Sequence, residues 1–188
     1  MCFDTNYGKI ARLKRDRFAI STYPFGVDAI STVNTIPTDW FTRGADRAAE
    51  KIVIAETGWN SESLVAMLGT QCLLAIPSSE TEELAYLQRV VADADAHRIE
   101  LVTWWSNRDV IEAKVMTDCP CTFDEQWCNI VTAFRSTGSD DASRFLGEAM
   151  LKMFGTMGVR GYEGTPKPLV FPFWQSVLAR PLNIAGSG

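Results

Sequence analysis

The stretch that most constrains the fold is residues 52–59, which read IVIAETGW. It begins with four apolar residues without polar alternation, a pattern typical of a strand buried on both faces. Such strands belong to parallel sheets, in which functional side chains gather at the C-terminal ends of the strands. Glu56 stands where this strand is expected to end, so it is the first candidate for a functional carboxylate.

Two other segments are predicted to be strands of the same sheet. Residues 18–23 have the β-branched and aromatic content of a strand, and residues 99–105 form a second apolar run. Before that run, residues 80–97 repeat apolar side chains at helical spacing, and Ser78 or Ser79 precedes them as a helix cap. Strand, helix, strand is the unit of a parallel sheet, so the sequence predicts an α/β chain with parallel strands alternating with helices.

The rest of the chain predicts further helices and one long excursion. Residues 60–63 are predicted to be a polar loop, residues 73–76 are an apolar run of undecided type, and residues 117–141 are the excursion. Helices are expected at about residues 38–50, 124–134, 144–154 and 166–178. No internal repeat or low-complexity linker interrupts the sequence, so residues 1–188 are predicted to form a single domain.

Charge and hydropathy argue against two classes of partner. The formal net charge is -5 and the basic residues are scattered, which argues against a nucleic acid as partner. No apolar run approaches the roughly 20 residues that a membrane-spanning helix needs, so no membrane association is expected. Residues 1–6 show no charged region followed by an apolar one, so no signal peptide is recognised.

Five cysteines leave their chemical state open. Cys119, Cys121 and Cys128 lie close together in the sequence, around a proline-containing segment. A zinc site is one reading, but the spacing fits no standard ligand set and the one histidine, His97, lies in a helical pattern, so no metal is expected. A disulfide within the group, in an exported protein, and free buried thiols are the other two readings.

Four motifs together resemble the C-terminal part of a TIM-barrel glycoside hydrolase, of the large clan that places its catalytic carboxylates after strands four and seven. Residues 21–24 (STYP) resemble the end of strand six, and residues 54–59 (IAETGW) resemble strand seven with its nucleophile. The ETGW part is also similar to the motif of plant-type β-1,3-glucanases. Residues 102–105 (VTWW) are similar to strand eight, and residues 161–168 (GYEGTPKP) resemble the turn that enters the final helix. The order and spacing of the four motifs are the specific part of the resemblance.

The resemblance implies a partial (β/α) barrel that corresponds to about strands six to eight. A complete barrel needs about 250 residues, and the half that holds the acid/base carboxylate after strand four has no counterpart here. The expected Asn-Glu pair is absent, because Asp124-Glu125 lies out of order in the excursion. The resemblance implies hydrolysis of a β-glucan or related β-glycan, with a carbohydrate as substrate and no cofactor, and little turnover by this chain alone. It also implies secreted full-length relatives, and it leaves the localisation of this chain open.

The resemblance assigns roles to three polar side chains. Glu56 takes the part of the nucleophile of a retaining mechanism, in which one carboxylate attacks and a second protonates the leaving group. Tyr23 is expected beside Glu56, with its hydroxyl hydrogen-bonded to the carboxylate, and Asn107 is expected to reach sugar hydroxyls from the rim. Without such roles, Glu56 is a solvated glutamate at a helix-facing loop, Tyr23 a core aromatic that ends a strand, and Asn107 a solvated surface residue.

Three tryptophans are candidates for stacking on the apolar faces of sugar rings: Trp59, Trp104 and Trp105. Successive side chains of a strand point to opposite faces, so only one of Trp104 and Trp105 faces the site. We select Trp104 for the site, and expect Trp105 to pack under the helices.

Two other readings use the same residues. One is a non-catalytic carbohydrate-binding protein whose exposed sheet edge pairs two copies into a homodimer. The other is a different α/β fold that shares only the strand-end glutamate, in which an added strand pairs with the edge of residues 18–23.

Overall fold

The computed structural model describes residues 16–26, 30, 32–41, 51–68, 71–110 and 153–181, with the backbone alone for 64–68 and 71–75. The helix expected at 124–134 and the cysteines at 119, 121 and 128 lie outside these residues. Most residues of the helices expected at 38–50 and 144–154 also lie outside the described residues.

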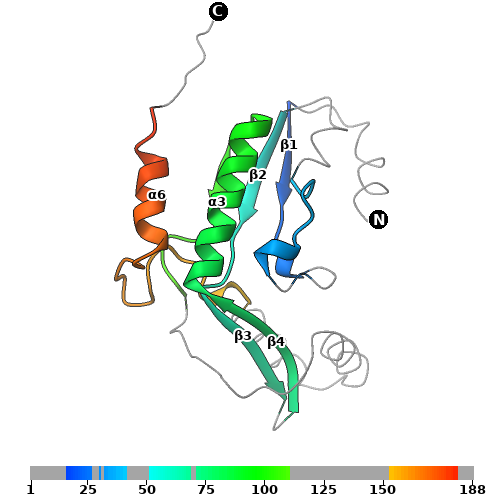
Figure 1. The fold of residues 1–188 in the computed structure, drawn as a ribbon, viewed down its shortest axis with the longest axis vertical. Helices are drawn as coiled ribbons and strands as arrows, with labels where there is room; N and C mark the ends of the chain where they lie inside the picture. Colours follow the sequence, from blue (N-terminus) through cyan, green and yellow to red (C-terminus); the bar gives the residue numbers. More distant parts are fainter. Residues whose placement is uncertain are drawn as a thin grey trace, which may run out of the picture.

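The centre of the described chain is a three-stranded parallel sheet, which confirms the prediction of an α/β chain. Its strands are β1 (Arg17–Ser21), β2 (Lys51–Thr57) and β5 (Val102–Trp104), in the order β1-β2-β5. Figure 1 labels β1 and β2. Strand β2, which contains the apolar run, is the middle strand and pairs with a neighbour on each edge. Within the described residues, no strand other than β2 pairs with β1.

Two helices lie beside one another next to this sheet. Helix α3 (Glu80–His97) connects to β5, and helix α6 (Val170–Leu178) lies on the side of α3 away from β1 (Figure 1). The Ser79 hydroxyl caps α3 by accepting the Glu82 N–H at 3.3 Å, and Glu80 accepts the amides of Leu169 and Val170 at the start of α6. Both helices confirm the predictions from periodicity. Among the described helices, none has the length and apolar character to cross a bilayer.

A two-stranded antiparallel ribbon interrupts the expected path from β2 to α3. Strands β3 (Glu62–Leu68) and β4 (Gln71–Ser79) form this ribbon, which extends away from the sheet and α3 (Figure 1). The expected polar loop at 60–63 is therefore wrong in its second half, because β3 begins at Glu62. The physical reason is in the sequence: two apolar runs flank Gly69-Thr70, and two runs separated by a two-residue Gly-containing link favour a hairpin.

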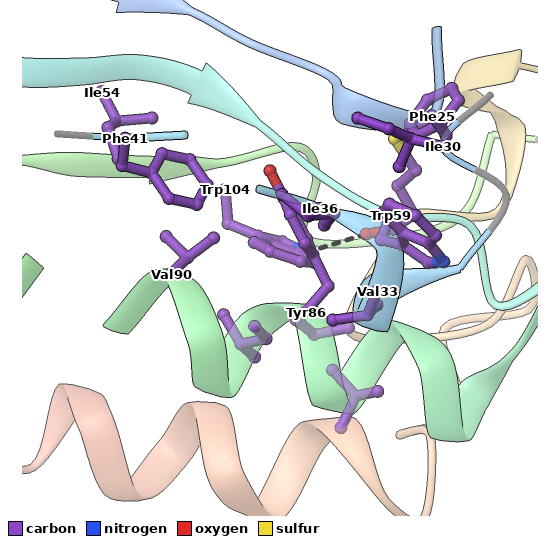
Figure 2. Packing of buried hydrophobic residues seen from close by; sticks show 14 of the residues in the cluster. Phe25, Ile30, Val33, Ile36, Phe41, Ile54, Trp59, Tyr86, Val90 and Trp104 are labelled. Atoms are coloured by element: carbon purple, nitrogen blue, oxygen red, sulfur yellow. Dashed lines mark hydrogen bonds between the residues drawn. The ribbon is translucent and has the colours of Figure 1, made fainter. Parts of the chain in front are cut away.

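The hydrophobic core lies between the sheet and α3. Tyr86 of α3 points toward the sheet, with ring centroids 5.1 Å from Trp59 and 5.9 Å from Trp104 (Figure 2). Its hydroxyl lies 2.6 Å from the Thr57 Oγ1, and Thr57 donates its own proton to the Thr22 carbonyl at 2.7 Å, so Tyr86 is the donor of this pair. Burial raises the pKa of Tyr86, which therefore stays a neutral donor. The core also receives side chains from the short 3-10 helices η1 (Pro24–Gly26) and η2 (Val33–Thr35), of which Phe25 and Val33 are buried.

Candidate active site

A bulge in β2 decides the direction of Glu56. Ile20 of β1 pairs with Ile54, but the next residue, Ser21, pairs with Glu56, so Ala55 is an extra residue in β2. Because of it, both Ile54 and Thr57 face the core under α3. Neighbouring side chains of a strand point to opposite faces, so Glu56, next to Thr57, points away from α3.

Tyr23 meets Glu56 at the ends of the two strands. The Tyr23 hydroxyl donates a hydrogen bond to the Glu56 Oε1, and the Thr22 N–H donates to the Glu56 carbonyl at 2.9 Å, which holds the strand ends in register. Burial, followed by the hydrogen bond to Glu56 and its charge, raises the pKa of Tyr23. The phenol is therefore a permanent donor to a half-buried carboxylate. Any role of this pair in binding or catalysis stays a prediction.

Trp105, not Trp104, lies on the side of Tyr23 and Glu56. Trp105 is 37% exposed, its Nε1 donates to the Phe154 carbonyl at 3.2 Å, and its ring lies 6.0 Å from that of Phe154. Phe154 in turn contacts Tyr23 edge-on at 4.9 Å. These three aromatic side chains form a row that ends at Glu56.

The selection of Trp104 is therefore corrected. Trp104 pairs with Thr57 across β2 and β5, and residues paired in a sheet share a face. Since Thr57 faces α3, Trp104 does so too, and its indole donates to the Met157 carbonyl at 2.9 Å within the core. Regular alternation along β2 is the expectation from the sequence, and the bulge at Ala55, which sets the facing of Thr57, breaks it.

The structure also corrects the expectation for Trp59. This side chain is only 1% exposed; it packs against Phe25 and Tyr86, and its indole donates to the Ser78 Oγ at 3.0 Å. It cannot stack on a sugar without leaving the core. Asn107, by contrast, is exposed in the segment after β5, where its carbonyl accepts the Arg160 N–H at 3.1 Å.

Phe154 was not among the sequence-based site candidates. It belonged to the apolar positions of the helix expected at 144–154, and nothing local distinguishes it from a core residue. Its contact with Tyr23 joins segments far apart in the chain, and only the folded structure shows it.

The row of aromatic side chains beside a carboxylate is suited to a ligand with apolar faces and polar edges. Exposed aromatic rings stack on apolar surfaces, and the carboxylate accepts hydrogen bonds or attacks an electrophilic carbon. In the part of the chain that the structure describes, no group of three or more His, Cys, Asp or Glu side chains is placed to hold a metal ion.

Comparison with known proteins gives weak similarities to solved structures. No protein-family model matches the chain, and no curated protein matches it. The chain is similar to a glycoside hydrolase family 17 β-1,3-glucanosyltransferase from Rhizomucor miehei, with a TM-score of 0.44 and 18% identity, over 81% of this chain and 41% of that one. An active-site mutant of the β-1,3-glucanosyltransferase from that organism, in complex with laminaritriose, gives the same TM-score and coverage at 17% identity. A β-glucuronidase from Ruminococcus gnavus gives a TM-score of 0.45 and 15% identity, over 88% of this chain and 22% of that one. The chain spans less than half the length of each of these proteins.

Proposed function

We propose that this chain is a glycoside hydrolase-like protein of the retaining type, with Glu56 as the nucleophile. The observation that supports this most directly is the hydrogen bond from Tyr23 to Glu56 at the C-terminal ends of two adjacent parallel strands. A fixed neutral donor on one carboxylate oxygen orients the other for attack on an anomeric carbon. The exposed indole of Trp105 beside Phe154 supplies a surface for the sugar ring, and Asn107 a polar group at the rim.

The proposed substrate is a β-glucan or a related β-glycan, and the proposed fold is a segment of a (β/α) barrel. The order β1-β2-β5 supports the barrel fold, because parallel strands that follow one another along the chain are neighbours in a barrel sheet. A retaining enzyme needs a second carboxylate about 5 to 5.5 Å from the first, as proton donor to the leaving group. The sequence has no motif for that residue, so we propose weak or absent turnover of natural glycosides by this chain alone.

Covalent labelling tests the role of Glu56 without the missing proton donor. The folded protein is incubated with 2-fluoro glycosides that have a very good leaving group, across several sugars, and adducts are located by mass spectrometry. We expect one adduct, on Glu56, which Glu56→Gln abolishes and Glu163→Gln, at an exposed carboxylate, retains. If the folded protein gives no adduct with any sugar, the assignment of Glu56 as nucleophile is wrong.

A second candidate function is carbohydrate binding without chemistry, and the 37% exposure of Trp105 favours it. An exposed indole beside another ring stacks on a sugar whether or not a reaction follows. β-1,3-Glucan oligosaccharides should then alter the tryptophan fluorescence, and Trp105→Ala should remove this response while Trp174→Ala retains it. If the oligosaccharides bind at Trp105 and no glycoside labels Glu56, carbohydrate binding without chemistry would be favoured over glycoside hydrolysis.

A further inference from the structure

A buried group of charged side chains lies apart from the candidate site and is not used by the proposed function. The Lys167 ammonium donates to the Glu83 Oε2 at 3.1 Å, to the Asp109 Oδ1 at 2.9 Å and to the Thr156 carbonyl at 3.0 Å. Glu83 is 0%, Asp109 4% and Lys167 8% exposed. Glu83 lies on α3, Asp109 follows β5, and Lys167 precedes α6, so the group joins three parts of the chain.

The hydrogen bonds in this group are unevenly shared. All three ammonium protons of Lys167 have acceptors, and the Asp109 Oδ1 also accepts the Gly158 N–H at 2.7 Å. Among the described residues, Glu83 receives one hydrogen bond, at Oε2, and its buried Oε1 has no hydrogen-bond partner. Ionisation of a carboxylate is strongly disfavoured when one of its oxygens is buried without a donor. Asp109, by contrast, has two donors that stabilise its charge.

The charges of the group also do not balance. Two carboxylates and one ammonium leave a net negative charge on side chains that are all buried. Of the described charged groups that act on Glu83, Lys167 favours its ionisation, while Asp109 and Glu80 oppose it. Glu62 of β3 is subject to the same three charges. One proton on the group removes the excess charge, and Glu83, which is buried most deeply and has fewest donors, is the residue to receive it.

We propose that Glu83 holds a proton in the folded protein, and that Lys167, Asp109 and protonated Glu83 form a pH-sensitive clasp between α3, the segment after β5 and the segment before α6. Release of the proton leaves a second carboxylate facing Asp109 and loosens the clasp.

The clasp bears on the position of residues 153–161. The Thr156 carbonyl and the Gly158 amide, both bonded to the clasp, belong to this segment, as does Phe154, whose carbonyl accepts the Trp105 indole. Loosening the clasp is therefore expected to increase the exposure of Trp105. This consequence follows whether or not Glu56 is a nucleophile.

The direction of the pH effect follows from the pKa values. Burial raises the pKa of Glu83 well above its usual value, and burial also raises the pKa of Asp109 and of Glu62. The folded state then holds a proton that the unfolded state has released. Stability is complete below the unfolded-state pKa, and it falls as the pH rises toward the folded-state pKa of Glu83. One such proton increases the unfolding equilibrium constant by up to about tenfold per pH unit in that interval.

Urea unfolding between about pH 5 and about pH 9 tests the clasp. Glu83→Gln imitates the protonated side chain, because its amide oxygen accepts from Lys167 and its NH2 replaces the O–H. We expect the unfolding equilibrium constant of the parent chain to increase as the pH rises across this range. The constant of Glu83→Gln should equal that of the parent at the acid end and increase much less toward the alkaline end. The matched control Glu163→Gln, at an exposed carboxylate, should follow the parent. A Glu83→Gln chain that is less stable at every pH, with an unchanged slope, would overturn the proposal.

Infrared spectroscopy of the folded protein gives a second readout that does not depend on unfolding. At neutral pH the parent should show the carbonyl band of a protonated carboxylic acid. Glu83→Gln should lose this band, and Glu163→Gln should keep it. A parent spectrum without the band would show that Glu83 is ionised and would reject the clasp even if the variants fold poorly.

Discussion

The side chain of Glu56 owes its direction to the bulge that Ala55 makes in β2. If β2 kept a regular alternation through Ala55, Glu56 would share the face of Ile54 toward α3, where it would be a carboxylate among Tyr86, Trp104 and other core side chains. With the bulge, Thr57 takes the core position and its hydroxyl meets that of Tyr86. The bulge thus keeps the Glu56 carboxylate out of the hydrophobic core.

Replacement of Tyr23 by Phe is expected to destabilise the chain. The half-buried Glu56 carboxylate loses its phenol donor, and a hydrogen bond to a charged group contributes about 1.5 to 3 kcal/mol, so we expect a loss of about 1 to 2 kcal/mol with partial exposure taken into account. Urea unfolding at neutral pH measures this. The same substitution at Tyr162, which is 45% exposed, should change the stability little. Equal effects of the two substitutions would contradict the importance of the Tyr23 hydroxyl.

Two glycines in the same segment should respond very differently to alanine. A Cβ at Gly158 would lie 2.3 Å from the Arg108 carbonyl carbon and the Asp109 nitrogen, whereas at Gly161 the nearest atom is the Thr165 oxygen at 3.8 Å. Gly158→Ala must move backbone, so we expect it to cost about 3 kcal/mol or more. Gly161→Ala is expected to stay within about 1 kcal/mol of the parent. Thermal unfolding of the two variants distinguishes them. A Gly158→Ala chain as stable as the parent would contradict the close approach of Gly158 to the backbone of Arg108 and Asp109.

At the scale of elements, local patterns predicted most of what the structure shows. The three parallel strands, α3 and α6 followed from apolar runs and helical periodicity, because each of these patterns is contained in the element itself. The ribbon of β3 and β4 was missed, although apolar runs on both sides of Gly69-Thr70 favour a hairpin.

The parts of the site that were not predicted depend on relations between distant segments. Which of Trp104 and Trp105 faces Glu56 depends on the register of three strands and on the bulge at Ala55. The buried contact between Glu83 and Lys167 joins positions 84 residues apart. No local pattern contains such information, because charged residues in a sequence read as solvated until their partners are known.

The start of α3 offers a test at the scale of one element. The Ser79 hydroxyl caps the helix through the Glu82 N–H, so Ser79→Ala is expected to lower the free energy of unfolding by about 1 kcal/mol. Ser79→Asp should restore most of it, because an aspartate caps as well and also favours the positive end of the helix dipole. Circular dichroism during urea unfolding gives both values. A Ser79→Ala chain as stable as the parent would show that the cap contributes nothing.

For the whole molecule, association of two copies through a sheet edge stays a prediction. In the described part of the chain, β1 and β5 each pair with β2 on one side. We expect the second edge of β5 to pair with β5 of another copy, so light scattering is expected to give twice the chain mass of 20.9 kDa. Thr103→Lys, at the exposed position of β5, should reduce the mass to one chain, and Thr165→Lys, in the turn before α6, should not. A parent that remains a single chain at high concentration would rule out this dimer.

The ribbon of β3 and β4 leaves and rejoins the rest of the protein at nearly the same place. Near its base, Trp59 and Ser63 both hydrogen-bond Ser78, so the two ends of the ribbon are already held together by side chains outside its apolar runs. A segment with adjoining ends can lengthen, shorten or be exchanged at small cost in chain entropy. This makes the ribbon a natural position for evolutionary insertion and for engineered grafts, while the parallel sheet and α3 keep their arrangement.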